Sequence, residues 1–254
     1  PDAAPGTDEF DLFIKEVANE MTTKAGQKCT AIRRTFVPEG MLTDVMAALS
    51  KRLEGVRVGD PSVEGVRMGP LAGAPQVQEV RKSVDRIARV AERVFGAPDS
   101  VEVVGADARK GAFFPTLLFY AKDPFAASEP HDVEAFGPVN TVMPYKTVDD
   151  AIALTRKGRG SLCGSLFTAD DAVAREVILG TAAYHGRLLT VNRHCAKEST
   201  GHGSPMPHLV HGGPGRAGGG EEMGGVRGVL HYMQRTALQG HPTTLTRVVR
   251  EYLQ

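Results

Sequence analysis

Strand-like and helix-like segments alternate from residue 30 to residue 191, and this alternation constrains the fold more than any other feature of the sequence. Short apolar runs typical of strands lie at 30–37, 101–104, 113–120, 139–145, 161–167 and 186–191. Amphipathic helical patterns lie among them, at 42–53, 77–95, 148–156 and 169–179. Such alternation predicts an α/β domain with a mostly parallel sheet flanked by helices.

A cysteine lies at the junction between a predicted helix and the first of these strands. The helical pattern of residues 8–21 is followed by Gly26, a plausible C-cap, and Cys29 comes three residues later. Cationic neighbours favour the thiolate, which is the nucleophilic form of cysteine, and three cations are close in sequence: Lys28, Arg33 and Arg34. A lone cysteine is more often a buried structural residue. The residues alone therefore leave both roles open for Cys29.

Charge and cysteine content argue against several classes of protein. Thirty basic residues balance thirty acidic ones, so no net field favours nucleic acid or anionic lipid. No apolar run approaches the roughly 20 residues that a membrane-spanning helix needs. The three cysteines, Cys29, Cys163 and Cys195, are odd in number and widely spaced, which is typical of a reducing compartment. We expect a cytoplasmic protein with no nucleic-acid or membrane partner.

The composition changes after Asn192, where residues 193–228 become rich in glycine, histidine and proline. The stretch 213–218 matches the GxGxxG pattern of dinucleotide-binding loops, but its flanks lack the required strand and helix, so we expect a tight loop. Five nitrogen or sulfur ligands fall within 18 residues: His194, Cys195, His202, His208 and His211. Because no Cys-x-x-Cys pair accompanies them, we predict a polar loop near a substrate pocket and no metal. A strand at 229–237 and a helix at 242–252 are predicted beyond this segment.

The stretch VEAFGPVN, residues 133–140, places a glutamate, a phenylalanine and a Gly-Pro turn before an apolar strand. One interpretation is a surface turn with an anchoring aromatic side chain. The other is a ligand site, in which the Glu134 carboxylate accepts hydrogen bonds from sugar hydroxyls and the Phe136 edge packs on a ring. The residues alone do not decide between them.

Seven motifs, in this order along the chain, resemble those of the C-terminal half of the aldehyde dehydrogenase superfamily. They are GQKC at 26–29, VGDP at 58–61, MGPL at 68–71, FFPTLL at 113–118, EAFGPV at 134–139, SLFT at 165–168 and TVN at 190–192. The resemblance covers essentially the whole chain. It implies a catalytic domain over residues 1–191, followed at 192–254 by a glycine- and histidine-rich loop, an oligomerisation strand and a C-terminal helix. It also implies that the family's N-terminal cofactor-binding domain is absent from this chain, which reads as a fragment.

The resemblance implies a chemistry for particular residues. Cys29 would attack the aldehyde to give a thiohemiacetal and then a thioester, Glu134 would bind the nicotinamide ribose, and Phe136 would pack near the nicotinamide. The general-base glutamate and the oxyanion-hole asparagine would lie upstream of Pro1, so we expect the isolated chain to be inactive. Residues 202–224 would shape the substrate entrance. The stretch GVLHYMQRTAL, 228–238, would pair with a neighbouring subunit, giving a homodimer or an assembly of dimers.

The long segment 197–240 points to a subgroup of the family. It is similar to the corresponding segment of members that use NADP to oxidise ring-opened, CoA-bound semialdehydes during aerobic degradation of phenylacetyl-CoA or benzoyl-CoA. The resemblance therefore implies oxidation of a CoA-linked semialdehyde to the carboxylate with NADP, or alternatively with NAD. Two other hypotheses remain open. One is an aldehyde dehydrogenase of broader substrate range, and the other is a non-catalytic, truncated assembly module.

Overall fold

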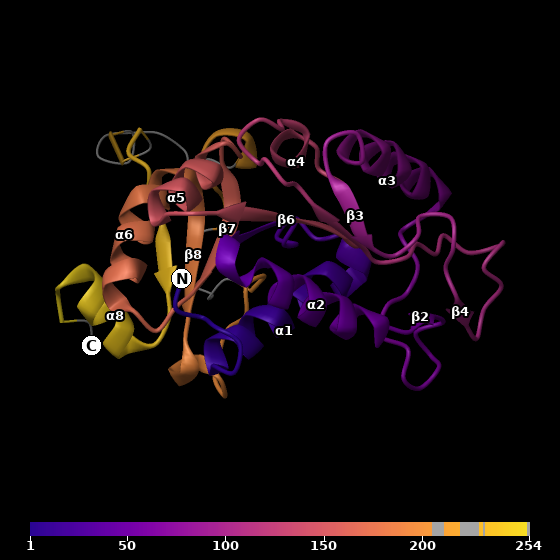
Figure 1. Cartoon of the computed structure of the whole chain (residues 1–254), viewed down its shortest axis with the longest axis horizontal. Coiled ribbons are helices and arrows are strands. Elements are labelled where there is room, and N and C mark those ends of the chain that lie inside the picture. Colours follow the sequence, from indigo (N-terminus) through magenta and orange to yellow (C-terminus); the bar gives the residue numbers. More distant parts are fainter. Residues whose placement is uncertain (205–210, 219–228, 231, 253–254) are drawn as a thin grey trace. The chain divides into compact units, whose positions relative to one another are not determined.

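The computed structural model of the chain describes residues 1–204, 211–218, 229–230 and 232–252 (Figure 1). It divides into two compact units. Unit 1 comprises Pro1–Phe13 and Lys146–Gln254, and unit 2 comprises Ile14–Tyr145. Helix α1 (Asp8–Thr22) begins in unit 1 and ends in unit 2. The functional boundary predicted between residues 191 and 192 stays a prediction.

Unit 2 is built on a four-stranded sheet with the order β1-β6-β5-β3. Three strands are parallel: β1 (Arg34–Pro38), β6 (Val139–Tyr145) and β5 (Leu117–Tyr120). The edge strand β3 (Glu92–Phe95) runs antiparallel to β5. A separate short parallel pair joins β2 (Val58–Gly59) to β4 (Val103–Val104). The mostly parallel sheet predicted from the alternating pattern is confirmed.

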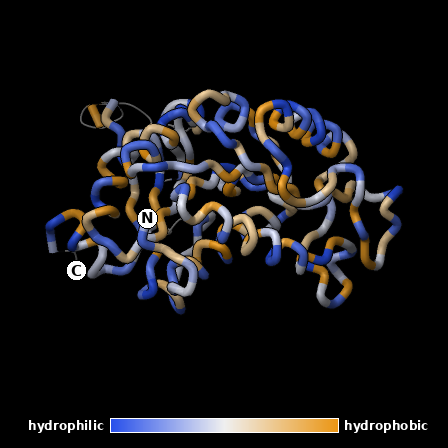
Figure 2. The backbone as a smooth tube through the Cα atoms, in the orientation of Figure 1, coloured by the Kyte–Doolittle hydropathy of each residue, from blue (hydrophilic) through white to orange (hydrophobic). Residues whose placement is uncertain are grey.

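Three helices complete unit 2: α2 (Leu42–Glu54), α3 (Ala74–Ile87) and the short α4 (Glu129–Asp132). Helix α3 buries Val80, Val84 and Ile87, which recur at helical spacing and therefore share one face. Its turns alternate between hydrophobic and hydrophilic residues in Figure 2. The buried face joins a core that includes Leu117 and Phe119 of β5. Helix α3 therefore packs against β5, the strand next to β6.

Several predicted boundaries in unit 2 are wrong, and three of them by the largest margin. The helix predicted at 77–95 ends at Ile87, and residues 92–95 form β3 instead, because their backbone groups pair with β5. The strand predicted at 30–37 begins only at Arg34, since a turn at 29–30 and irregular backbone at 31–33 come before it. The strand predicted at 113–120 begins at Leu117.

Unit 1 contains a fully parallel sheet with the order β7-β8-β9. Its strands are β7 (Ser161–Phe167), β8 (His185–Val191) and β9 (Ala237–Gln239). Its described helices include α5 (Val148–Arg156), α6 (Asp171–Thr181) and α8 (Pro242–Val249). One leucine from each strand packs against α6 and α8 to form a core: Leu166, Leu188 and Leu238. In the described part of the chain, no helix has both the length and the apolar character needed to cross a membrane.

The C-terminal elements differ from those predicted. The described residues of the strand predicted at 229–237 are mostly not strand: 229–230 are helical, and β9 begins at Ala237. This strand pairs in parallel with β8 of its own chain. Helix α8 ends at Val249 rather than at residue 252, because the next residue, Arg250, adopts a left-handed conformation (φ 59°). Farther upstream, the predicted β6, α5 and β7 are confirmed to the residue.

Candidate active site

Cys29 lies between α1 and β1, shortly after a strained turn. After α1 ends at Thr22, the next residues form a short 3-10 turn in which Lys24, Ala25 and Gly26 have φ values of 53°, 53° and 70°. Left-handed backbone costs a non-glycine residue about 1–2 kcal/mol, and such strain clusters at functional sites. Residues 26–33, named the thiol turn here, follow directly and expose the reduced thiol of Cys29.

The thiol turn packs against residues 134–140, named the carboxylate segment. Gly26 lies so close to this segment that a Cβ atom there would come within 2.2 Å of the Gly137 carbonyl oxygen. Gln27 donates from Nε2 to the carbonyl oxygen of Phe136 at 3.2 Å. Asn140, fully buried, donates from Nδ2 to the carbonyl oxygen of Ile32 at 2.9 Å. The structure therefore brings together two segments that the sequence separates by about a hundred residues.

Within the carboxylate segment, exposure alternates along an extended stretch. The Glu134 side chain is 51% exposed and Phe136 is 40% exposed, whereas Ala135 between them is buried. A purely anchoring phenylalanine would be buried, so the anchor interpretation fits this ring poorly. Both side chains of the predicted cofactor contacts are accessible to a ligand, and their roles in binding stay predictions.

The three cations predicted near the thiol have different partners. The Lys28 ammonium pairs with buried Glu20 at 2.7 Å, and Arg34 lies 3.3 Å from His131 Nδ1. Arg33 contacts the carboxylate segment, where its Nη1 lies 3.3 Å from Oε1 of Glu134. In the sequence, Arg33 is only a possible neighbour of the thiol. No local sequence pattern predicts the ion pair between Arg33 and Glu134, because the two residues are far apart along the chain.

Two glutamates near the N-terminus, Glu9 and Glu20, are held in ion pairs. Glu20 binds Lys28, and Glu9, only 1% exposed, accepts from the backbone N–H of Arg193 at 2.8 Å and from its guanidinium at 3.1 Å. Burial tends to raise the pKa of Glu9, but the hydrogen bonds and charge of Arg193 outweigh it and leave this pKa below its usual value. Glu9 is therefore committed to holding residue 193 in unit 1.

Replacing Arg193 by methionine should lower the thermal unfolding midpoint at pH 7, and the loss should shrink toward pH 4. Because the folded pKa of Glu9 is depressed, its pair stabilises the fold above the unfolded glutamate pKa of about 4.3 and stops doing so as the pH falls through the folded value. In the variant a buried, uncompensated carboxylate is relieved by protonation at low pH. Calorimetry at several pH values would measure this. The exposed Arg247 pairs with Asp171, so Arg247→Met is the control and should show little change. Equal losses at pH 7 and pH 4 would contradict the assignment.

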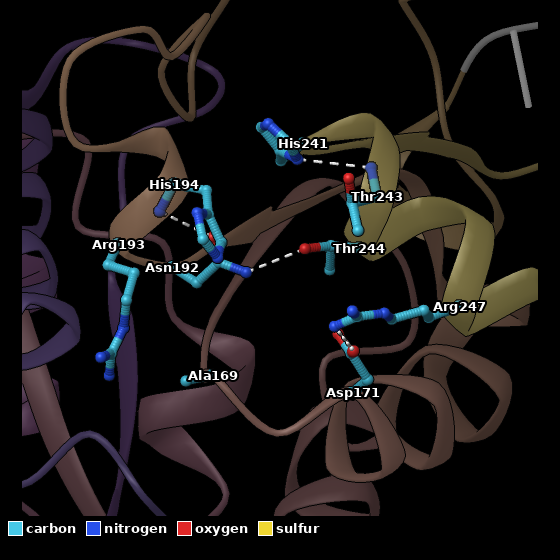
Figure 3. Close-up of a pocket in the computed structure, with 9 residues that line it drawn as sticks. All are labelled: Ala169, Asp171, Asn192, Arg193, His194, His241, Thr243, Thr244 and Arg247. Atoms are coloured by element: carbon cyan, nitrogen blue, oxygen red, sulfur yellow. Dashed lines mark hydrogen bonds and ion pairs between the residues drawn. The ribbon is translucent and has the colours of Figure 1, made fainter.

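A polar pocket of about 180 Å³ lies in unit 1, where the segment after β8 meets the start of α8 (Figure 3). Asn192 donates to the Thr244 hydroxyl at 2.9 Å, and the rings of His194 and His241 are 5.3 Å apart. Figure 3 shows the Arg193 side chain pointing away from the other labelled residues. The second arginine of the lining, Arg247, is paired with Asp171. Both arginine charges are thus balanced by neighbouring carboxylates.

Four of the five candidate metal ligands lie in the described part of the chain, and they do not form one group there. His194 lies beside His241, Cys195 is buried with Leu189 and Val191, and buried His202 places Nδ1 2.7 Å from Ser165 Oγ. No group of three or more suitable ligands occurs among the described residues. His208 lies outside them, as do 205–210 and 219–224 of the predicted substrate entrance.

The GxGxxG stretch forms a tight turn. Gly213 donates its N–H to the carbonyl oxygen of Gly218 at 2.9 Å, and Arg216 donates to that of Arg159 at 3.1 Å. Gly215 and Gly218 adopt positive φ values of 55° and 74°. This geometry agrees with the predicted loop, although residues on both sides of it, 205–210 and 219–228, lie outside the described part.

Comparison with known proteins finds one family. A model described as the aldehyde dehydrogenase family matches residues 5–238. The 3,4-dehydroadipyl-CoA semialdehyde dehydrogenase of Aromatoleum evansii is 45% identical over 84% of this chain and 42% of its own length. Protein MaoC of Klebsiella aerogenes is 49% identical over 73% of this chain and 54% of its own length. The chain thus spans about half the length of these curated relatives.

Solved structures show the same fold. An aldehyde dehydrogenase mutant from Pseudomonas syringae, complexed with NAD+ and octanal, matches with a TM-score of 0.69 and 25% identity. The match covers 90% of this chain and 43% of that one. Betaine aldehyde dehydrogenase from Staphylococcus aureus, in complex with NAD+, matches with a TM-score of 0.70 over 87% of this chain and 42% of that one. At 23% identity, the second likeness concerns the fold alone.

Proposed function

Because this chain belongs to the aldehyde dehydrogenase family, we propose that the enzyme it forms part of oxidises a CoA-linked semialdehyde to the carboxylate, with Cys29 as nucleophile. The observation that carries this proposal is the exposed Cys29 thiol on a turn packed against the segment that bears Glu134 and Phe136. The A. evansii relative is named for a CoA-linked semialdehyde, which supports the substrate class.

In the proposed reaction Cys29 Sγ, as a thiolate, bonds to the aldehyde carbon, and the carbonyl oxygen becomes the oxyanion of a thiohemiacetal. Loss of hydride leaves a thioester on Cys29, and water cleaves it to the carboxylate and regenerates the thiol. Covalent catalysis thus divides one difficult step into easier ones. The packing of the thiol turn against residues 134–140 serves this chemistry by holding the sulfur in place, since small displacements of a reacting group lower rates steeply.

A nicotinamide cofactor is the proposed hydride acceptor, and two residues suit part of it. The Glu134 carboxylate is half exposed, and beyond its pair with Arg33 its oxygens have no further partner in the described residues, so it can accept hydrogen bonds from ribose hydroxyls. The exposed Phe136 ring offers an apolar face. When bound, the nicotinamide supplies the redox chemistry that protein side chains lack. We propose NADP from the subgroup resemblance, with NAD as the alternative that the NAD+ complexes of the solved relatives support.

The full-length enzyme should prefer a CoA-linked semialdehyde over the free semialdehyde of the same chain length by about 100-fold in kcat/KM, because remote binding energy lowers the barrier by about 2.8 kcal/mol. Rates of NADPH and NADH formation with each substrate would measure both preferences. Equal kcat/KM values for the two aldehydes would support the broader dehydrogenase instead. A folded protein that oxidised neither would support a non-catalytic assembly module. We propose that the natural substrate is an intermediate of the aerobic degradation of phenylacetyl-CoA or benzoyl-CoA. The same rate measurements, made with ring-opened CoA-linked semialdehydes, would test this.

We also propose that the enzyme is a homodimer or an assembly of dimers. Three apolar side chains before β9 are largely exposed: Val229, Tyr232 and Met233. Strand β9 lies at the edge of its sheet in the described residues, and exposed edges invite pairing with another chain. Light scattering that showed a stable monomer would count against this assembly. A cytoplasmic location, supported by the three reduced cysteines, likewise remains a proposal.

A further inference from the structure

Arg33 makes more contacts at the candidate active site than its place in the sequence suggests. Its side chain is only 15% exposed. Three of its hydrogen bonds go to carbonyl oxygens of the thiol turn: Nη2 donates to Gly26 at 3.3 Å and to Lys28 at 2.8 Å, and Nη1 donates to Ala31 at 3.2 Å. A fourth, from Nε to the carbonyl oxygen of Ala135 at 3.3 Å, reaches the carboxylate segment. One guanidinium therefore ties the backbone on both sides of Cys29 to a segment about a hundred residues away.

The same guanidinium also faces both predicted cofactor contacts. Its Nη1 lies 3.3 Å from Oε1 of Glu134, and its central carbon lies 5.0 Å from the centre of the Phe136 ring. Burial lowers the pKa of Arg33, while the negative charges of Glu134, Cys29 and Glu20 act in the opposite direction. The positive charge of Arg33 thus interacts with the nucleophile and with the carboxylate at once.

We infer that Arg33 is a positioning residue of the dehydrogenase site. It holds the thiol turn at a set distance from the carboxylate segment, and it orients Glu134 for the cofactor ribose. This inference rests on the proposed function. A guanidinium suits the task because its planar fork presents five donors in fixed directions, whereas a lysine ammonium is a point charge that cannot serve four separate carbonyls and a carboxylate.

A double-mutant cycle in the full-length enzyme would test this role. The variants are Arg33→Met, Arg33→Lys, Glu134→Gln and the double variant Arg33→Met with Glu134→Gln. Arg109→Met is the matched control, because Arg109 is 89% exposed and pairs only with nearby Asp107 among the described residues. Three quantities would be measured: the NADPH dissociation constant by its fluorescence, the unfolding midpoint, and the rate of Cys29 alkylation by iodoacetamide without cofactor, read by peptide mass spectrometry.

We expect Arg33→Met to raise the NADPH dissociation constant about tenfold, which corresponds to about 1.4 kcal/mol. In the Glu134→Gln background the same change should have little further effect, because Arg33 acts through Glu134 and coupled residues are not additive. The rate of Cys29 alkylation should change about fivefold in Arg33→Met, because the thiol turn loses the three hydrogen bonds that the guanidinium donates to its carbonyl oxygens. Arg33→Lys keeps the charge but lacks the planar fork, so it should restore the wild-type alkylation rate only in part.

Two outcomes would overturn the inference. One is an Arg33→Met variant that matches Arg109→Met in both NADPH binding and Cys29 alkylation. The other is fully additive effects of the Arg33 and Glu134 changes on NADPH binding, which would indicate a general structural role. Failure of the proposed function is distinguishable, because a wild-type enzyme that oxidises no aldehyde would reject that function while the cofactor-free alkylation rates still report on Arg33.

Discussion

Replacing Cys29 by alanine in the full-length enzyme should lower kcat for aldehyde oxidation by about 10⁴-fold or more, the scale seen when an enzyme loses its covalent nucleophile. The physical reason is that no bond to the substrate can form, so the thiohemiacetal that releases hydride is never made. Initial rates of NADPH formation would measure the change. Binding of NADPH should persist, because alanine removes only the exposed sulfur from the turn.

The other two cysteines provide matched controls for this experiment. Cys163 is half-buried on β7, and Cys195 is buried against Leu189 and Val191. Neither lies in the thiol turn, so Cys163→Ala and Cys195→Ala should leave kcat within a few-fold of wild type if the proteins fold. Retained activity in Cys29→Ala would reject the nucleophile assignment and the mechanism built on it.

Replacing Gly26 by alanine should disrupt the site without touching any reacting atom. An added Cβ would lie 2.2 Å from the Gly137 carbonyl oxygen, 2.4 Å from its carbon and 2.8 Å from the Pro138 nitrogen. These are backbone atoms, so no side chain can rotate out of the way. The φ of Gly26, 70°, is also unfavourable for alanine. Overpacking and strain together should cost about 2–5 kcal/mol.

The clash between the Cβ added at residue 26 and the backbone of Gly137 and Pro138 should also lower the rate of catalysis. To relieve the clash, the thiol turn must move away from the carboxylate segment, and a displacement of about 1 Å can lower a rate about 100-fold. The unfolding midpoint and kcat would both be measured. Gly40→Ala is the control, because a Cβ there meets nothing within 4 Å and its φ is not positive. If Gly26→Ala behaved like Gly40→Ala, the close packing of the two segments would be wrong.

Local patterns predicted much of the fold, and their failures share a cause. The strands β6 and β7 and helix α5 match the predictions to the residue, since each has a clear period and, for α5, a Thr147–Asp150 capping box. The error at 77–95 arose because Val90, Ala91 and Val94 continue the apolar period of α3. What ends the helix is pairing of residues 92–95 with β5, which no local pattern reveals.

In the candidate site, too, local motifs predicted some features, while others depend on contacts between distant segments. Cys29, Glu134 and Phe136 were identified from ordered motifs, and the structure places them on two segments in contact through Gln27, Arg33 and Asn140. Of the three cations near the thiol in sequence, Arg33 pairs with Glu134, whereas Lys28 pairs with Glu20 and Arg34 lies beside His131. Their directions depend on partners such as Glu20 and His131, which become neighbours only when the chain folds.

By itself, the sequence determined the α/β class, the order of most elements and the motifs that mark the aldehyde dehydrogenase family. These features depend on residue type and short-range spacing, and both can be read from the linear sequence. Only the tertiary structure decided that Gln27 bonds to Phe136 across 109 residues and that Arg33 joins the thiol turn to the carboxylate segment. It also decided that His194 lies beside His241, whereas His202 lies beside Ser165. Such contacts follow from burial and hydrogen-bond satisfaction in three dimensions, and neither quantity is a function of local sequence.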